Sequence, residues 1–339
     1  MMKRHSWITG EPFVFEGGGS VDSLTLVYHT SDREYRPGEK VLWICHALTG
    51  NSDPEDWWPQ MVGKGCLIDP EQYYIVCVNM LCSPYGSTGP SSINPATGKP
   101  WYMDFPDTTV RDIVRANILV RKHLGIEHID MMLGPSIGGF QTLEWCIMEP
   151  DIIDAAIFLA TATRVSPYLT AFNESQRMAI LADPSFKEAK SLEGGKDGLA
   201  CARSIALISY RTYDGYNATQ EETDPDTLFA DRAGSYQRYQ GLKLVRRFDA
   251  YSYWYLSRSL DSQNVGRGRG GVEAALSRIK ARCAVISIDS DVLFPPKHGK
   301  ETVAALKWAS YYEISSIYGH DGFLIESDQL SAILRPLLP

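Results

Sequence analysis

The five-residue segment 134–138, Gly-Pro-Ser-Ile-Gly, constrains what this chain can fold into more than any other stretch. An apolar run over residues 128–133 precedes it and predicts a buried strand, and residues 139–145 continue with apolar positions at helical spacing. A serine on a sharp turn between a strand and a helix is typical of a nucleophile elbow, in which small flanking residues let strand and helix approach closely. Because this short pattern also occurs by chance, the interpretation depends on the rest of the chain.

Predicted strands and helices alternate along most of the chain. A helix is predicted over residues 108–124, where polar and apolar side chains occupy opposite sides, and another follows the elbow. Such alternation indicates an α/β fold with a mostly parallel sheet and helices on both faces. The predicted strands cover residues 41–45, 73–78, 129–133, 155–160 and 284–288.

The interval 166–276 interrupts this alternation. It is rich in helix-forming and aromatic residues and contains polar loops. With 339 residues the chain also exceeds the usual size of a single hydrophobic core. We therefore predict an α/β core formed by residues 1–165 and 277–339, with residues 166–276 inserted as a helical lid.

An acid and a histidine follow the elbow in the order that a serine nucleophile of this kind requires. Asp291 comes just after the predicted strand 284–288, and His320 stands in a glycine-flanked loop near the C-terminus. A neutral imidazole accepts the serine proton, while a carboxylate on its other nitrogen fixes the tautomer. The predicted catalytic residues are Ser136, Asp291 and His320. Asp289 is an alternative acid, and capping of the next turn is an alternative role for Asp291.

The strand 41–45 leads into the polar turn 46–50, where the third strand of such a fold should end. The loop after that strand supplies one backbone N–H of an oxyanion hole, and the residue after the nucleophile supplies the other. We therefore expect Leu48 and Ile137 to be the two donors. His46 is interpreted as a buried histidine hydrogen-bonded to neighbouring loops rather than as a catalytic residue.

Composition narrows the class of protein further. A net charge of −8 argues against nucleic acid as a partner, and no apolar run approaches the length of a membrane span. Seven cysteines, mostly in apolar patterns, and an N-terminus without an apolar signal region favour a reduced, cytoplasmic protein. No Cys or His cluster has metal-ligand spacing. The glycine-rich segment 266–271 fits a dinucleotide motif, but a predicted helix rather than a strand precedes it, so we reject that reading.

Several segments together resemble the homoserine O-acetyltransferase family, whose members have the α/β-hydrolase fold. The resemblance implies acetyl transfer from the co-substrate acetyl-CoA to the side-chain hydroxyl of L-homoserine, through an acyl-Ser136 intermediate, in methionine biosynthesis. It also implies no bound cofactor and a homodimer that meets through its lids. Pro135 departs from the family, which commonly has glycine there, as does the segment 82–84. The matching segments are 46–50, 85–95, 104–106, 134–138, 171–174 and 319–321.

The same resemblance implies the residues that bind the acceptor. Arg203 and Tyr210 are seven residues apart and share one face of a predicted helix, where they match the pair that binds the substrate carboxylate. Asp321 matches the residue that receives the substrate ammonium. Homoserine O-succinyltransferase, serine O-acyltransferase and serine esterase activity remain alternatives, because each uses the same three catalytic residues.

Overall fold

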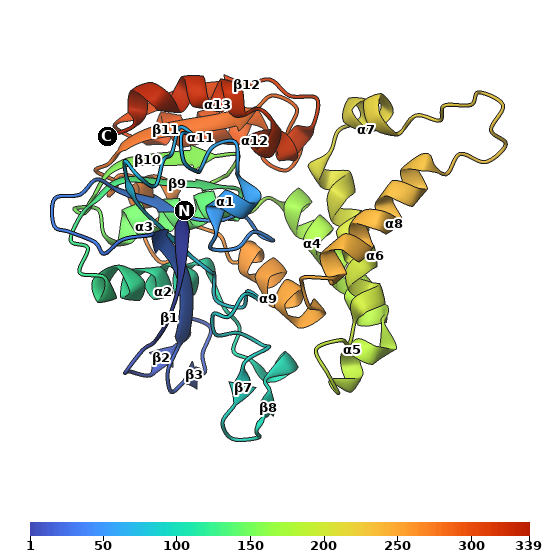
Figure 1. The fold of residues 1–339 in the computed structure, drawn as a ribbon, viewed down its shortest axis with the longest axis horizontal. Helices are drawn as coiled ribbons and strands as arrows, with labels where there is room; N and C mark the ends of the chain where they lie inside the picture. Colours follow the sequence, from blue (N-terminus) through green and yellow to red (C-terminus); the bar gives the residue numbers. More distant parts are fainter.

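A central, mostly parallel sheet with helices on both faces forms the core of the computed structural model, which describes residues 1–339 (Figure 1). Its strand order is β1-β4-β6-β5-β9-β10-β11-β12. The pairs β1–β4 and β4–β6 are antiparallel, and every other pair is parallel. The predicted fold class is therefore confirmed. The strands are β1 (Met2–Ile8), β4 (Thr25–Ser31), β5 (Val41–Ile44), β6 (Tyr74–Val78), β9 (Ile129–Pro135), β10 (Ile153–Leu159), β11 (Arg282–Ile288) and β12 (Ala309–Ile314).

All five predicted strands are present, with ends that differ from the prediction by at most two residues. The antiparallel pair β1–β4 at one edge of the sheet was not predicted. No residue of β1 is fully buried, because this strand lies at the edge of the sheet and turns polar residues to solvent. Two short hairpins were also unforeseen: β2 (Phe13–Val14) with β3 (Ser20–Val21), and β7 (Ile93–Asn94) with β8 (Lys99–Pro100).

Each parallel strand alternates its side chains between two buried layers. In β5, Trp43 joins a cluster of 57 buried residues, whereas its neighbours Leu42 and Ile44 join a cluster of 21. Helices α2 (Val110–His123), α3 (Ile137–Met148) and α11 (Pro296–Ala305) cover the larger layer. Helix α13 (Ser327–Leu334) and the short α1 (Pro54–Trp57) and α12 (Gly322–Ile325) cover the smaller one. The sheet is thus buried on both faces, as a parallel sheet requires.

Helix α2 illustrates how local sequence sets an element's ends. The Thr109 side chain accepts a hydrogen bond from the Asp112 backbone N–H, and the Asp112 side chain accepts one from the Thr109 N–H. This capping box satisfies two donors that the first helical turn leaves free. Arg121, Lys122 and His123 occupy the last turn, where basic side chains offset the negative end of the helix dipole.

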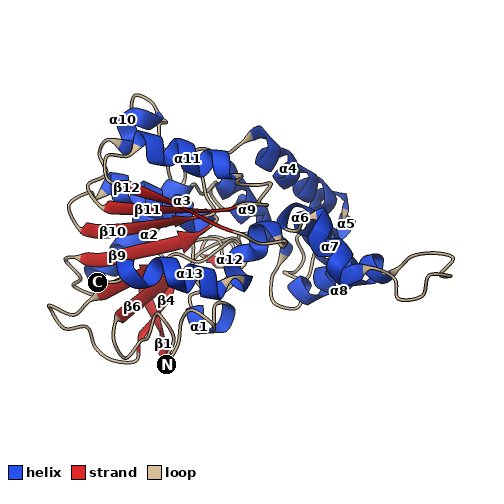
Figure 2. Cartoon of the chain, turned by 90° about the horizontal axis from the view of Figure 1, so that it is seen from above, coloured by secondary structure: helices blue, strands red, loops and turns tan.

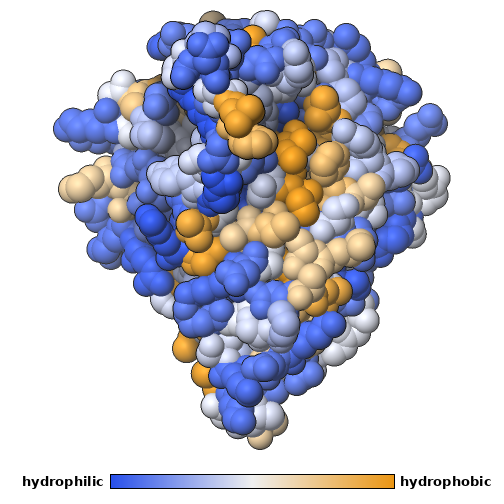
Figure 3. Space-filling model, turned by 90° about the vertical axis from the view of Figure 1, so that its right-hand side faces the viewer, coloured by the Kyte–Doolittle hydropathy of each residue, from blue (hydrophilic) through white to orange (hydrophobic).

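A group of helices projects from the core on the side toward which the parallel strands point (Figures 1 and 2). Figure 3 looks onto this side and shows apolar side chains gathered near its centre. Helix α9 lies between the projecting helices and the core, and α10 lies against the core. The helices of the interval 166–276 are α4 (Pro167–Ala182), α5 (Pro184–Glu188), α6 (Lys196–Tyr210), α7 (Tyr213–Gln220), α8 (Arg232–Val245), α9 (Ala250–Asp261) and α10 (Val272–Leu276).

Buried polar contacts fasten these helices to α9. Arg177 of α4 is 4% exposed, and its guanidinium lies 2.7 Å from both Glu174 and Asp261. Asn173 donates a second bond to Asp261, at 2.8 Å. Because an unpaired buried charge is costly, this network favours one fixed placement of α4 on α9. Helix α9 is tied in turn to the core, where the Tyr255 hydroxyl donates to the Phe105 carbonyl at 2.6 Å.

Short 3-10 turns complete the chain at η1 (Tyr102–Asp104), η2 (Gly319–Asp321) and η3 (Arg335–Leu337). No helix is long and apolar enough to cross a lipid bilayer. All seven cysteines are free thiols, and five of them are buried.

Candidate active site

Ser136 occupies the turn between β9 and α3 in a conformation that side chains rarely adopt, with φ 60° and ψ −123°. Three nearby glycines make this turn possible. A Cβ atom on Gly134 would lie 2.3 Å from the Gly138 carbonyl carbon, and one on Gly138 would lie 2.1 Å from the Cys45 carbonyl oxygen. A Cβ on Gly139 would meet Thr161 at 2.5 Å. The strained serine is therefore held by close contacts that only glycine permits.

Pro135 turns its missing N–H away from β10 and toward the β5 side of β9, where the Cys45 N–H donates to the Leu133 carbonyl at 2.8 Å. The pairing of β5 with β9 ends at Ile44 and Leu133, two residues before the proline. On the other side of β9, the Ser136 N–H donates to the Leu159 carbonyl at 3.0 Å. Successive N–H groups of a strand point to opposite sides, so the proline costs no hydrogen bond to β10.

His320 is buried in the turn after β12, and its Nδ1 lies 2.7 Å from Oδ2 of Asp291. The other carboxylate oxygen of Asp291 accepts the backbone N–H groups of Leu293 and Phe294, at 2.8 and 3.0 Å. Asp289 faces elsewhere, accepting from the Ser315 hydroxyl and the Ser316 N–H. The structure thus brings Asp291, and not Asp289, to the histidine.

Two opposing effects set the protonation of His320. Burial disfavours the imidazolium, but the charge of Asp291, its hydrogen bond and the nearby Asp321 outweigh burial and raise the pKa of His320 above its ordinary value. The Nδ1–H···Oδ2 bond leaves Nε2 as the free ring nitrogen of the neutral form. Ser136 and His320 line the same cavity, of about 170 Å³.

One of the predicted oxyanion donors lines this cavity, and the other directly follows Ser136 in the chain. Leu48 lines it directly, and its N–H donates no hydrogen bond within the protein. Ile137 is the first residue of α3, so its N–H has no acceptor one turn earlier. The close contact of Gly138 with the Cys45 carbonyl presses the loop that carries Leu48 against the turn that carries Ile137. The free N–H of Leu48 thus belongs to a residue that lines the cavity with Ser136, and the free N–H of Ile137 belongs to the residue that follows Ser136.

The residues predicted to bind an amino acid line the same cavity. Arg203 and Tyr210, both on α6, line the cavity, and the Arg203 guanidinium carbon is 5.4 Å from the Tyr210 ring centroid. Arg203 forms no ion pair with any carboxylate of the chain. Asp321 lines the cavity too, but its Oδ2 already accepts a hydrogen bond from Arg211 at 2.7 Å. The site thus offers, in Arg203, a cation without an ion pair and, in Asp321, a carboxylate with a free oxygen, Oδ1.

Arg247 is a cavity residue that sequence reasoning missed. It lies in the segment between α8 and α9, and its Nη1 donates to the Thr49 carbonyl at 2.6 Å and to the Tyr85 hydroxyl. Tyr85 opens the segment 85–95 that resembles the homoserine O-acetyltransferase family. A lone arginine between two helices has no spacing relation to a motif, so no local signal points to it.

Two arginines of the glycine-rich segment 266–271 are occupied elsewhere. Arg267 pairs with Glu16 at 2.8 Å, and Arg269 pairs at 2.7 Å with Glu144, which is buried on α3. Arg111 also contacts Glu144, at 3.4 Å. These contacts give the segment a structural role in fastening the N-terminal region and α3, which agrees with our rejection of a nucleotide site there.

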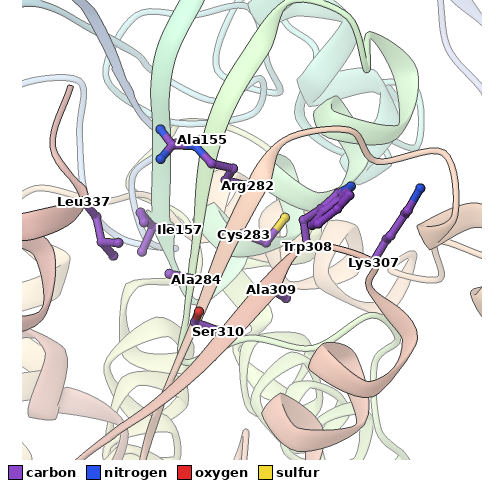
Figure 4. A pocket seen from close by; sticks show the side chains of 10 residues that line it. All are labelled: Ala155, Ile157, Arg282, Cys283, Ala284, Lys307, Trp308, Ala309, Ser310 and Leu337. Carbon is purple, nitrogen blue, oxygen red and sulfur yellow. The ribbon is translucent and has the colours of Figure 1, made fainter.

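A larger hollow, of about 400 Å³, lies at the opposite end of the strands (Figure 4). It is lined by residues from the beginnings of β10, β11 and β12, with Arg282, Lys307 and Trp308 at its rim. It contains neither the strained serine nor the buried histidine, so its size does not make it the candidate active site. The smaller cavity lies at the carboxyl ends of the strands, where ligands bind in open α/β sheets.

The fold and the cavity together define the class of the protein. A family profile described as the alpha/beta hydrolase fold matches residues 40–327. The elbow after β9, the acid after β11 and the histidine after β12 follow one another in the chain order of that class. The chain is an α/β-hydrolase-fold protein.

Comparison with individual proteins identifies the family. The chain is 43% identical to the homoserine O-acetyltransferase of Cyclobacterium marinum, over 96% of its own length and 92% of that protein. The crystal structure of homoserine O-acetyltransferase from Bacillus anthracis matches with a TM-score of 0.91 and 25% identity, over 100% of this chain and 98% of the other. Esterase E22 shares the fold alone, with a TM-score of 0.90 and 23% identity over 100% of both chains. The chain belongs to the homoserine O-acetyltransferase family, and the resemblance seen in its motifs is confirmed.

Proposed function

We propose that this chain is an acyltransferase that moves an acetyl group from acetyl-CoA to the side-chain hydroxyl of L-homoserine, a step of methionine biosynthesis. One observation carries the proposal: an unpaired arginine and a carboxylate, Arg203 and Asp321, line the same cavity as Ser136 and His320. A free amino acid carries one charge of each sign, and these two groups match them. An esterase for simple esters has no need of such a pair.

In the first half-reaction, His320 Nε2 removes the proton from Ser136 Oγ as that oxygen attacks the thioester carbonyl. The resulting oxyanion accepts hydrogen bonds from the Leu48 and Ile137 N–H groups. The carbon–sulfur bond then breaks, and the imidazolium returns its proton to the departing CoA thiolate. Asp291 stabilises the imidazolium and keeps the proton of the neutral ring on Nδ1. The product of this half-reaction is acetyl-Ser136.

In the second half-reaction, homoserine enters the space that CoA has left. Arg203 and Tyr210 bind the carboxylate of homoserine. The free Oδ1 of Asp321 accepts a hydrogen bond from the homoserine ammonium, while Oδ2 of Asp321 keeps its hydrogen bond from Arg211. His320 deprotonates the side-chain hydroxyl, which attacks the acetyl-serine carbonyl. Collapse of the second tetrahedral intermediate releases O-acetylhomoserine and restores the Ser136 hydroxyl. The reaction is ping-pong, because CoA leaves before the acceptor reacts.

The size of the cavity favours a small acyl group. Pockets for drug-sized ligands commonly span about 300–1,000 Å³, whereas this one is about 170 Å³. An acetyl group is shorter than a succinyl group by two carbons and lacks its carboxylate. Arg203 is the natural partner for the acceptor's carboxylate, so a second carboxylate on the acyl group would compete with homoserine for it.

The test is CoA release by the purified protein with acetyl-CoA or succinyl-CoA, each with L-homoserine, with L-serine or without acceptor. We expect release from acetyl-CoA that depends on homoserine and is lost in the Ser136→Ala variant. Release mainly from succinyl-CoA, or mainly with serine, would keep the mechanism and change the substrate. Release that no acceptor stimulates would favour an esterase-like hydrolase instead.

We infer further that two copies associate through their lids. Large apolar side chains are exposed on the lid helices, in the region seen in Figure 3, and exposed apolar clusters commonly mark protein interfaces. Sedimentation equilibrium should give twice the chain mass of 37.9 kDa, and the Ile208→Glu variant should shift the mass toward one chain. A wild-type protein of single-chain mass at micromolar concentration would contradict the inference. The exposed residues on these helices are Tyr168, Met178, Ile208, Tyr213, Tyr239 and Leu242.

A further inference from the structure

His46 is fully buried directly after β5, at the start of the turn that carries Leu48. Both of its ring nitrogens are engaged by the backbone. Nδ1 lies 2.8 Å from the Ala47 carbonyl oxygen, and Nε2 accepts the Met80 N–H at 3.1 Å. Because Nε2 accepts a hydrogen bond, the proton of the neutral ring is on Nδ1, and Nδ1 is the donor to Ala47.

The Ala47 carbonyl is held by a second donor as well. The Gly50 N–H bonds to it at 2.9 Å and closes a β-turn over residues 47–50. A Cβ on Gly50 would lie 3.2 Å from the Ala47 oxygen and 3.4 Å from His46 Nδ1, so the turn is tightly folded around these groups. Two donors on one carbonyl leave its peptide plane little freedom to rotate.

The Ala47 carbonyl and the Leu48 N–H belong to the same peptide unit. A trans peptide is planar, and its C=O and N–H bonds point in opposite directions. Holding the Ala47 oxygen toward the core therefore turns the Leu48 N–H toward the cavity. That N–H is free of other partners, and Leu48 lines the cavity beside Ser136.

Burial keeps His46 in the form that this geometry needs. It lowers the pKa of His46 to about 4, so the ring stays neutral at all pH values where the enzyme would work. The ring forms no ion pair, and its only hydrogen bonds are to backbone groups. His46 is thus unsuited to exchange protons with a substrate.

We propose that His46 is a positioning residue that aims the Leu48 N–H at the reacting carbonyl oxygen by locking the Ala47–Leu48 peptide. This inference rests on the proposed function, because it gives a purpose to the predicted oxyanion hole. It assigns His46 no contact with substrate. Its effect belongs to the step that forms the tetrahedral intermediate, so it alters the acylation rate constant more than substrate binding.

Two substitutions at His46 distinguish the role of Nδ1 from the role of Nε2. In His46→Asn the amide nitrogen can take the place of Nδ1 and still donate to Ala47, whereas the contact with Met80 is lost. In His46→Gln the longer side chain can reach Met80 but leaves the Ala47 carbonyl without this donor. The readout is the burst of p-nitrophenol on acylation of Ser136 by p-nitrophenyl acetate, together with KM and the melting temperature.

Loss of an oxyanion donor commonly costs about 10²–10³ in rate, and a donor that is only misaimed should cost less, about 10–10². We expect His46→Gln to lose about 10–10² in acylation rate with little change in KM, and His46→Asn to lose about tenfold less. Equal losses in both variants, or losses that follow the melting temperature, would overturn the role. Gly50→Ala is a further variant, which keeps the histidine and crowds the Ala47 carbonyl at 3.2 Å and the His46 side chain at 3.3 Å. It should lower the acylation rate a few-fold at constant KM, and an unchanged rate would also count against the proposal.

The ester assay needs neither CoA nor homoserine, so it separates this inference from the proposed function. A wild-type burst without homoserine-dependent CoA release would refute the proposed acceptor and leave the comparison of His46 variants decisive. A folded wild-type protein with no burst would overturn both the catalytic assignment and the role of His46.

Discussion

Replacing Asp291 by asparagine should abolish most of the activity, although the two side chains have nearly the same size and shape. Oδ1 of Asp291 accepts the N–H groups of Leu293 and Phe294, so the oxygen of the new amide must stay at that position. The amide NH₂ then occupies the place of Oδ2 and faces Nδ1 of His320, 2.7 Å away. Two donors cannot share that contact, so His320 must move its proton to Nε2, the nitrogen that accepts the proton of Ser136.

In serine proteases, replacing the acid of the catalytic triad by asparagine gives the wrong tautomer of the histidine and lowers kcat by about 10⁴. A factor of 10⁴ corresponds to about 5 kcal/mol in the activation free energy. The assay is homoserine-dependent CoA release, followed with a thiol reagent, beside the melting temperature of each variant. We expect Asp291→Asn to lose about 10⁴ in kcat with a similar KM and a native-like melting curve.

Asp289→Asn is the matched control, because Asp289 is the neighbouring acid and contacts Ser315 and Ser316 rather than the histidine. It should keep kcat within a few-fold of the wild type. Asp291 does not control the tautomer of His320 if Asp291→Asn retains a tenth of the wild-type kcat, or if the two substitutions lower kcat equally.

Three further outcomes follow from the site. Arg203→Met should raise KM for homoserine about 10–100-fold and leave KM for acetyl-CoA unchanged, because a charged hydrogen bond contributes about 1.5–3 kcal/mol; equal effects on both substrates would contradict this. The activity should rise with pH through an apparent pKa above about 6.5, because Asp291 raises the pKa of His320 and only the neutral ring accepts a proton. The same raised pKa means that His320 stabilises the fold at low pH. That contribution to the free energy of unfolding is lost as the pH rises through the pKa of His320 in the folded protein. Gly138→Ala should destabilise the protein by about 3 kcal/mol in urea unfolding, because its Cβ would meet the Cys45 carbonyl, whereas Gly10→Ala, with open space around it, should not.

Sequence patterns predicted the core strands well because burial on both faces leaves a continuous apolar run. Strands β5, β6, β9, β10 and β11 all carry such runs, and the predicted ends lie within two residues of those observed. The edge strand β1 and its antiparallel neighbour β4 escaped prediction, and β1 has polar and exposed residues along most of its length. An edge strand is stabilised by its partner rather than by its own composition.

The candidate site was predictable to the extent that its residues stand at the ends of those strands. Ser136, Asp291 and His320 each follow a strand, so their common location follows from the parallel sheet. Contacts between the lid and the core have no such rule. Neither the hold of Arg247 on the Thr49 carbonyl nor the sharing of Asp321 with Arg211 can be inferred from spacing, because both depend on how α6, α8 and α9 dock.

The three catalytic residues alone do not separate a transferase from an esterase, because both activities occur on this fold with the same acyl-serine chemistry. What differs is which hydroxyl reaches the acyl-serine first. A bound and oriented acceptor reacts as if present at an effective concentration of about 10⁵ M or more, well above that of water. In the proposed mechanism, Arg203, Tyr210 and Asp321 provide that orientation within a cavity of about 170 Å³. Transfer of the acyl group to homoserine is therefore expected to depend on these three residues far more than acylation of Ser136 does. Substitutions at these residues should increase hydrolysis of the acyl-serine at the expense of transfer, while acylation continues.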